Sequence, residues 1–133
     1  MNETTNLLAW VARAEEDCTI ARSSLRRKKP LTYGACFHAQ QCAEKYLKAA
    51  LVAMGLGFPK THDLLTLNTL CEQAGMLFDV APAQLADLSS YAVQVRYPGE
   101  NPTPDEAAEA LEVAQLVRRV VRRWLRLKPK KAS

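Results

Sequence analysis

Polar and charged side chains recur at helical spacing between positions 36 and 51. Four of them could line a groove and meet a ligand: Gln41, Glu44, Lys45 and Lys48. Residues three and four positions apart lie on one face of a helix, so these groups would share a polar stripe beside an apolar one. The alternative, which the pattern alone favours, is a solvent-exposed face with an ordinary Glu44–Lys48 ion pair.

A second candidate lies at the Arg96-Tyr97 pair, just before the helix-breaking Pro98-Gly99. An arginine in the last turn of a helix can cap the free carbonyl groups there. Its planar guanidinium also suits phosphate oxygens. Tyr97 could stack on a base or simply cover the edge of the core. The pattern does not decide between helix capping and phosphate binding for Arg96, or between base stacking and core packing for Tyr97.

A basic stripe near the C-terminus is the third candidate. At about 100° per residue, five arginines fall on one side of a predicted helix: Arg118, Arg119, Arg122, Arg123 and Arg126. A positive face of this kind can bind RNA or an acidic partner. However, the front half of the same helix is acidic, and acids first with bases last is what the helix dipole favours in any case.

Other kinds of site have little support. The two histidines, His38 and His62, have no partners at the spacing of metal ligands. The four cysteines form no Cys-x-x-Cys pair, so we expect reduced, buried thiols. There is no glycine-rich phosphate loop and no Gly-x-Ser-x-Gly motif. We therefore expect no metal and no cofactor.

Length and charge set the frame for these groups. The chain has 133 residues, 48% of them hydrophobic and 24% charged, as expected of one globular domain. The net charge is +4, but eight of the 18 Lys and Arg residues lie between positions 117 and 133. The first residues do not resemble a secretory signal, and no apolar stretch is long enough to span a bilayer. We expect a cytoplasmic protein without membrane contact.

The hydrophobic periodicity is helical throughout. Five helices are predicted, at about 6–29, 33–54, 61–75, 82–97 and 103–127. Thr103-Pro104-Asp105-Glu106 is the clearest start, with an N-cap, a first-turn proline and an acid three residues after the cap. Because the connections are short, the helices should pack antiparallel, so the predicted fold class is an all-α, up-and-down bundle of four to five helices.

Taken in order, these motifs resemble the HEPN family of small helical proteins. The resemblance rests on three segments, 37–49 (FHAQQCAEKYLKA), 60–64 (KTHDL) and 96–99 (RYPG), together with Trp10 and Ala14. It covers residues 5–127, which form the predicted domain, and leaves 128–133 as a basic tail. Each motif is weak alone, but the set is specific.

The resemblance implies a helical bundle that forms a homodimer. It also implies a partner, because HEPN proteins are often encoded beside a minimal nucleotidyltransferase as a toxin–antitoxin pair. Many members are metal-independent ribonucleases. Their active site pairs an arginine with a histidine a few residues later, and the dimer brings two copies together in a cleft. Members without this motif act as nucleotide- or RNA-binding partners.

The sequence departs from the ribonuclease pattern at the position of that histidine. Arg96 occupies the place of the motif arginine, but Asn101 stands where histidine is expected and no histidine follows His62. Imidazole titrates near neutral pH and can move a proton, whereas an amide cannot. We therefore favour a protein that binds RNA or nucleotide through Arg96, Tyr97 and Asn101.

In that interpretation Lys45 and Lys48 are neighbours across the cleft, with Gln41 and Glu44 beside them. One alternative is a metal-independent endoribonuclease toxin that uses Arg96. Another is a purely structural dimer, in which Arg96 caps a helix and the basic stripe only keeps the protein in solution.

Overall fold

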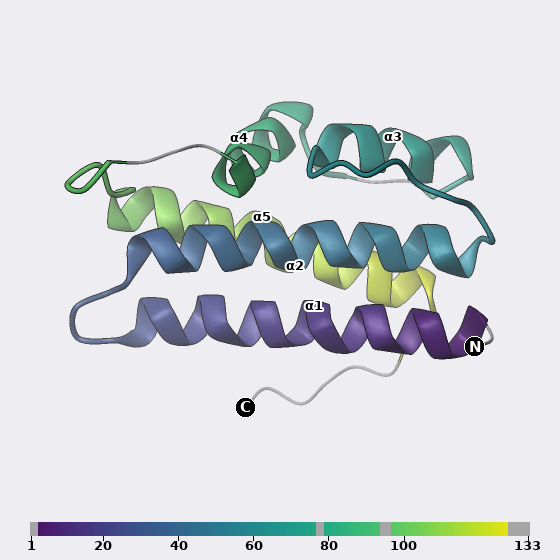
Figure 1. Cartoon of the computed structure of the whole chain (residues 1–133), viewed down its shortest axis with the longest axis horizontal. Helices are drawn as coiled ribbons and strands as arrows, with labels where there is room; N and C mark the ends of the chain where they lie inside the picture. Colours follow the sequence, from purple (N-terminus) through teal and green to yellow (C-terminus); the bar gives the residue numbers. More distant parts are fainter. Residues whose placement is uncertain (1–2, 77–78, 94–96, 128–133) are drawn as a thin grey trace.

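A computed structural model of the chain describes residues 3–76, 79–93 and 97–127. The described residues form five helices and no strand, which confirms the predicted all-α class (Figure 1). They are α1 (Glu3–Arg26), α2 (Thr32–Ala53), α3 (Leu64–Gln73), α4 (Pro82–Val93) and α5 (Pro104–Trp124). Two predicted features lie outside the described residues: Arg96 and the basic tail 128–133.

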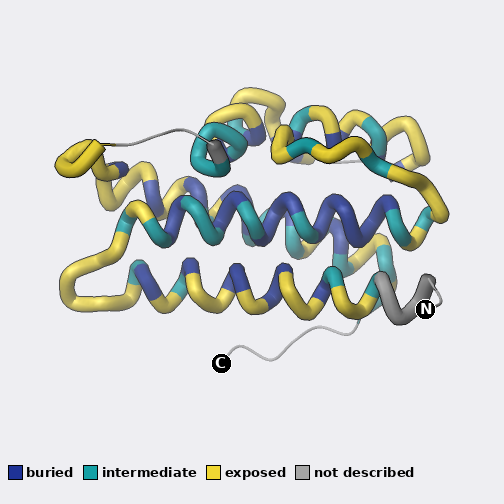
Figure 2. The backbone as a smooth tube through the Cα atoms, in the orientation of Figure 1, coloured by how far each residue is buried: buried dark blue, intermediate teal, exposed yellow. Residues whose placement is uncertain are grey.

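Helix α2 is the central element of the bundle and contacts all four other helices. Helices α1 and α2 run antiparallel, side by side (Figure 1). Helix α5 packs along the far side of this pair, while the shorter α3 and α4 cover the side of α2 that faces away from α1. Dark blue, buried positions recur along the whole length of α2 (Figure 2). The buried side chains of α2 therefore lie against a second helix.

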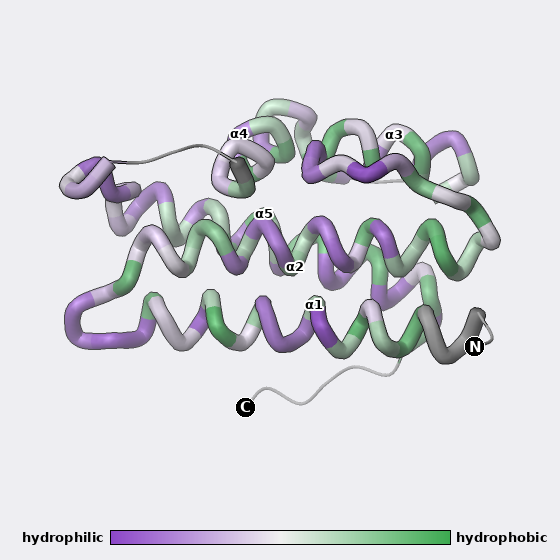
Figure 3. Tube along the Cα trace, viewed as in Figure 1, coloured by the Kyte–Doolittle hydropathy of each residue, from purple (hydrophilic) through white to green (hydrophobic). Residues whose placement is uncertain are grey.

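Small residues let the helices approach α2 closely. Ala35, Ala39, Ala43 and Ala50 are fully buried, and larger apolar side chains such as Leu47 fill the space between them. The hydropathy of α2 is nevertheless mixed, with hydrophilic positions interrupting the apolar ones in the middle of the helix (Figure 3). Polar groups are thus carried into the centre of the bundle.

The predicted starts and stops agree with the structure to within a few residues. Asp63 caps α3 by accepting a hydrogen bond from the backbone of Leu65. Thr103 and Glu106 form the predicted capping box of α5, with Pro104 as its first residue. The first helix ends at Arg26 rather than near 29, because the chain already bends over 27–29 and the Leu31 amide bonds the Ser24 carbonyl at 3.0 Å.

All four cysteines are buried as thiols and none forms a disulfide, as expected. They fill space in the core as small hydrophobic groups. Within the described part of the chain, none of the helices is long and apolar enough to cross a membrane.

Candidate functional site

A row of buried polar side chains runs along α2 at four-residue intervals. Gln40 is fully buried, Glu44 is 4% exposed and Lys48 is 8% exposed. The predicted Glu44–Lys48 ion pair is present, with Nζ and Oε2 at 3.1 Å. The expectation of a solvent-exposed face was wrong for Glu44 and Lys48, because His62 of the loop before α3 and Trp10 of α1 lie against them, whereas Gln41 and Lys45 are partly exposed. Burying such a row is costly unless its members satisfy one another.

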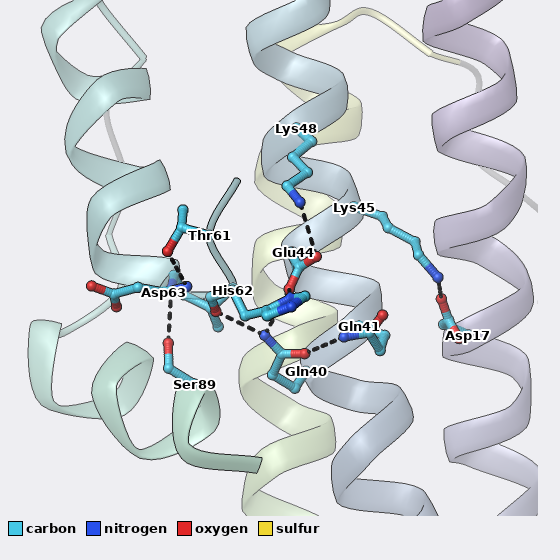
Figure 4. A network of polar contacts seen from close by, with 11 residues as sticks. Asp17, Gln40, Gln41, Glu44, Lys45, Lys48, Thr61, His62, Asp63 and Ser89 are labelled. Carbon is cyan, nitrogen blue, oxygen red and sulfur yellow. Dashed lines mark hydrogen bonds and ion pairs between the residues drawn. The ribbon is translucent and has the colours of Figure 1, made fainter. Parts of the chain in front are cut away.

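Glu44 is the centre of this row and accepts three hydrogen bonds (Figure 4). Gln40 Nε2 donates to Oε1 at 3.2 Å, and Lys48 donates to Oε2. His62 Nδ1 lies 2.8 Å from Oε1. An ionised carboxylate only accepts hydrogen bonds, so Nδ1 carries a proton. Neutral His62 then has its lone pair on Nε2, and the side chain is 57% exposed.

The end of the loop that carries His62 is fastened to two helices. Gln40 Nε2 also donates to the His62 carbonyl at 3.0 Å, which fixes the loop on α2. The Leu64 amide donates to Ser89 Oγ at 2.8 Å, which fixes it on α4. Between this loop and α4 lies a hollow of about 510 Å³. It is lined by Lys60, Thr61, His62, Asp63, Ala86, Ser89 and Ser90.

A second carboxylate, Asp17 on α1, holds two side chains of α2. Its two oxygens contact His38 Nδ1 at 2.8 Å and Lys45 Nζ at 2.5 Å. Both histidines of the chain thus have a ring nitrogen against a carboxylate. The contact with Asp17 also fixes Lys45 at the seam between α1 and α2.

Next to Lys45 is a groove of about 440 Å³ between α1 and α2. We call it the α1–α2 groove; it is lined by Ala9, Trp10, Arg13, Glu44, Lys45 and Lys48. The Lys48 ammonium lies 5.8 Å from the centroid of the Trp10 ring and 5.3 Å from that of Phe58. The two rings meet edge to face at 5.8 Å. One groove therefore combines an aromatic wall with cationic side chains.

The predicted site residues divide between the middle and the start of α2. Glu44, Lys45 and Lys48 line the α1–α2 groove, and Gln41 adjoins it on the same helix, where it donates to Gln40 at 2.7 Å. Asn101 instead lines a hollow of about 380 Å³ with residues 30–34, at the start of α2. Eleven residues separate position 34 from Lys45, or about 16 Å along a helix. Within the chain, these two groups are not brought together.

Near Asn101, Tyr97 is exposed at the surface. Residues 97–100 form a turn, in which the Glu100 amide bonds the Tyr97 carbonyl at 2.9 Å. Gly99 takes a φ of 93°, which only glycine adopts without strain. The turn therefore presents Tyr97 outward, close in sequence to the predicted Arg96.

The basic stripe on α5 has two parts. Arg118 makes a two-pronged contact with Glu15 of α1, at 2.6 and 2.9 Å, and Arg122 donates to Tyr46 of α2 at 3.2 Å. Tyr46 in turn donates to Glu15. Burial alone would raise the pKa of Glu15, but the hydrogen bonds from Arg118 and Tyr46 lower it to about 2. This half of the stripe joins three helices.

The other half of the stripe faces solvent, because Arg119, Arg123 and Arg126 are exposed. Of the five arginines in the stripe, only these three present an open positive face to a partner.

Several groups at the site were not predicted as site residues. Trp10 was noted only for the resemblance, and Arg13 and Asp17 were not singled out. Their signal was present, since positions 10, 13 and 17 follow helical spacing. It gained meaning only once α1 was known to lie against the Lys45 face of α2. Among the described residues, no group of three or more His, Cys, Asp or Glu side chains is placed to hold a metal ion.

Comparison with known proteins defines the class. The family model of the HEPN domain matches residues 7–124, so the chain belongs to the HEPN family. Among solved structures, the crystal structure of TT1696 from Thermus thermophilus is similar. The two chains are 30% identical with a TM-score of 0.66, over 88% of this chain and 96% of that one. A search of curated proteins gave no match.

Proposed function

We propose that this HEPN protein is the binding member of a toxin–antitoxin-type pair with a minimal nucleotidyltransferase in the cytoplasm. It forms a homodimer and binds RNA or nucleotide without the full chemistry of a ribonuclease. Arg96, Tyr97 and Asn101 contact the phosphate or base in the dimer cleft. In this role the protein recognises its ligand and leaves it intact.

The observation that carries the proposal is the position of every imidazole in the chain. The only histidines, His38 and His62, each contact a carboxylate on or against α2. Asn101 stands where the motif histidine is expected and lies at the start of α2, in the hollow beside the α1–α2 turn. An amide can hydrogen-bond a phosphate oxygen but cannot take a proton from a 2′-hydroxyl. Loss of a general acid–base group typically lowers a rate by about 10²- to 10⁴-fold.

A ribonuclease that uses Arg96 is the second candidate, and one contact favours it. Nδ1 of His62 contacts Glu44, and the same residue lines the hollow beside α4. A carboxylate behind an imidazole is the arrangement that prepares a general base. In this alternative, His62 takes the role of the absent motif histidine.

Cleavage of a mixed RNA pool in EDTA separates the two candidates. The wild-type protein is compared with Arg96→Ala, His62→Gln and Asn101→His. For a binding protein we expect no cleavage by the wild type, and the appearance of cleavage in Asn101→His would show a cleft that lacks only its proton carrier. Wild-type cleavage that both Arg96→Ala and His62→Gln abolish would overturn the proposal in favour of the ribonuclease.

Binding is measured on the same proteins, because absence of cleavage alone also fits a structural dimer. Labelled RNA is titrated at moderate salt, and the mass of the protein in solution gives its oligomeric state. We expect saturable binding by a dimer, weakened at least tenfold in Arg96→Ala. A protein that binds neither RNA nor nucleotides at any tested concentration would leave only the structural role.

A further inference from the structure

We propose that the α1–α2 groove is a binding site for a single nucleoside phosphate, within one protomer. The aromatic base stacks on Trp10, and the phosphate contacts Arg13 and Lys45. The inference rests on the proposed function for the general class of ligand. It deepens that function by naming the ligand and by placing it at a site separate from Asn101.

The size of the groove suits one nucleotide. Its volume of about 440 Å³ lies within the range of small-ligand sites and is too small for a folded RNA element. Ala9 contributes only a methyl group to the wall, and the neighbouring Trp10 is partly buried, so part of its side chain is open to the groove. A longer RNA would have to extend beyond the groove over the surface of α1.

The charges that line the groove favour an anion. Arg13, Lys45 and Lys48 oppose a single carboxylate, Glu44. Glu44 is already engaged by Lys48, whereas Arg13 is exposed and makes no ion pair with any side chain that the structure describes. Arg13 is therefore the cation most open to a phosphate, with Lys45, which is paired with Asp17, beside it in the lining of the groove. The planar guanidinium offers two parallel donors to the phosphate oxygens.

The position of Asp17 strengthens this assignment. Asp17 lies one helical turn after Arg13 and holds the ammonium of Lys45, a residue that lines the groove, at 2.5 Å. A prepositioned cation loses less conformational entropy on binding than a free surface lysine. The phosphate would share Lys45 with Asp17 rather than recruit it from solvent.

Trp10 supplies the contact that distinguishes a nucleotide from a simple anion. Phe58 packs edge-on against the indole and Lys48 lies over it, so the ring is fixed in orientation. Base–aromatic stacking tolerates any base because every base has a π face. Tight binding should therefore require both the base and the phosphate of the nucleotide, and a ligand with only one of them should bind weakly.

Trp10 also provides the measurement. The chain contains two tryptophans, so in Trp124→Phe the fluorescence reports on Trp10 alone. That variant is titrated with adenosine, adenosine monophosphate, inorganic phosphate and a single-stranded RNA tetramer. We expect saturable quenching by the monophosphate, with at least tenfold weaker binding of adenosine and of phosphate alone.

Arg13→Ala should weaken the binding of adenosine monophosphate at least tenfold, and Lys45→Ala should weaken it by a similar factor. Arg26→Ala is the matched control, since Arg26 is also an exposed arginine on α1 but lies about 20 Å further along the helix. It should bind as the parent does. Because Lys45→Ala also disturbs Asp17, helicity and thermal unfolding are compared for each variant; Arg13 is exposed, and its replacement tests the site even if the lysine variant unfolds.

The outcomes distinguish this site from the proposed function. If Arg96→Ala abolishes nucleotide binding and Arg13→Ala leaves it intact, the assignment of the α1–α2 groove as the nucleotide site is wrong, while the proposed function stands. Quenching by the RNA tetramer but not by the monophosphate would overturn the assignment of a single nucleotide. Equal binding of phosphate and monophosphate would reduce the groove to an unspecific anion site. No binding of any probe by any method would overturn both proposals.

Discussion

His62 and Glu44 are joined across 18 positions of sequence by a 2.8 Å contact between Nδ1 and Oε1. The contact connects the loop before α3 to the most central helix of the bundle. It also connects the two hollows, since His62 lines the one beside α4 and Glu44 lines the α1–α2 groove. A change at either residue is therefore felt on both sides of α2.

Glu44→Gln is expected to destabilise the fold strongly. The amide keeps the shape of the side chain but leaves the Lys48 charge buried without its counter-ion. Breaking a buried ion pair in this way costs about 3 kcal/mol. Denaturant unfolding followed by circular dichroism measures the loss, and Glu44→Gln combined with Lys48→Met should recover most of it. Equal stability of the single and double variants would show that the ion pair does not matter.

The stability of the protein should fall in acid because of Glu15. Its pKa is about 2 in the folded protein and near 4.5 ordinarily. A carboxylate with a lowered pKa stabilises the fold above its ordinary pKa, and this contribution is lost as the pH falls from about 4.5 towards 2. Other carboxylates titrate in the same range, so the quantity to measure is the difference in unfolding free energy between the wild type and Glu15→Gln. That difference should shrink steadily over this window; a constant difference would contradict the lowered pKa.

Much of the fold could be predicted from local signals. The capping box at Thr103, the proline at 104 and the cap at Asp63 depend on neighbouring residues, so the sequence states them directly. The apolar periodicity similarly indicates which segments are helical. The end of α1 was less certain, because Arg26 and the residues after it suit either the last turn of a helix or the bend that follows.

The candidate site depended on contacts that no local pattern contains. Helical spacing placed Gln41, Glu44 and Lys48 on one face but could not state whether that face was covered, and Gln40 was not singled out. The burial of Glu44 and Lys48 follows from the loop that returns from residue 55 to His62, and from α1 on the other side. In the same way, periodicity placed five arginines on one stripe of α5. It could not show that Arg118 contacts Glu15, which lies 103 residues earlier in the sequence and draws part of the stripe into the bundle.

The two halves of the basic stripe should respond differently to substitution. Arg118→Ala removes the main partner of Glu15 and should lower the unfolding free energy by about 3 kcal/mol. Arg119→Ala removes an exposed charge and should change it by less than about 0.5 kcal/mol. Chemical denaturation of the two variants provides a comparison between adjacent arginines. Similar losses would mean that the contact with Glu15 contributes nothing particular.

RNA binding gives a second test of the exposed half. If Arg119, Arg123 and Arg126 contact phosphates, replacing all three by alanine should reduce the salt dependence of RNA binding. Each phosphate contact on a single strand contributes about 0.7 to the slope of log K against log salt, so we expect the slope to fall by about 2 in the triple variant. An unchanged slope would restrict the RNA-binding surface to other parts of the protein.

Thiol labelling should report on the opening of the seam between α1 and α2. The pKa of Cys18 is lowered to about 7, mainly by a hydrogen bond with Cys42 and against the effect of burial. A thiol with this pKa is largely ionised at pH 8 and would react quickly if it were accessible. Cys18 is fully buried, however, as are the other three cysteines.

In native protein at pH 8 we expect labelling by a thiol reagent to be slow, with all four thiols reacting in denaturant. Glu44→Gln should accelerate the native reaction in proportion to its loss of stability, because labelling then follows the open population. Rapid labelling of a single cysteine in the native wild type would instead show that α1 separates locally from α2.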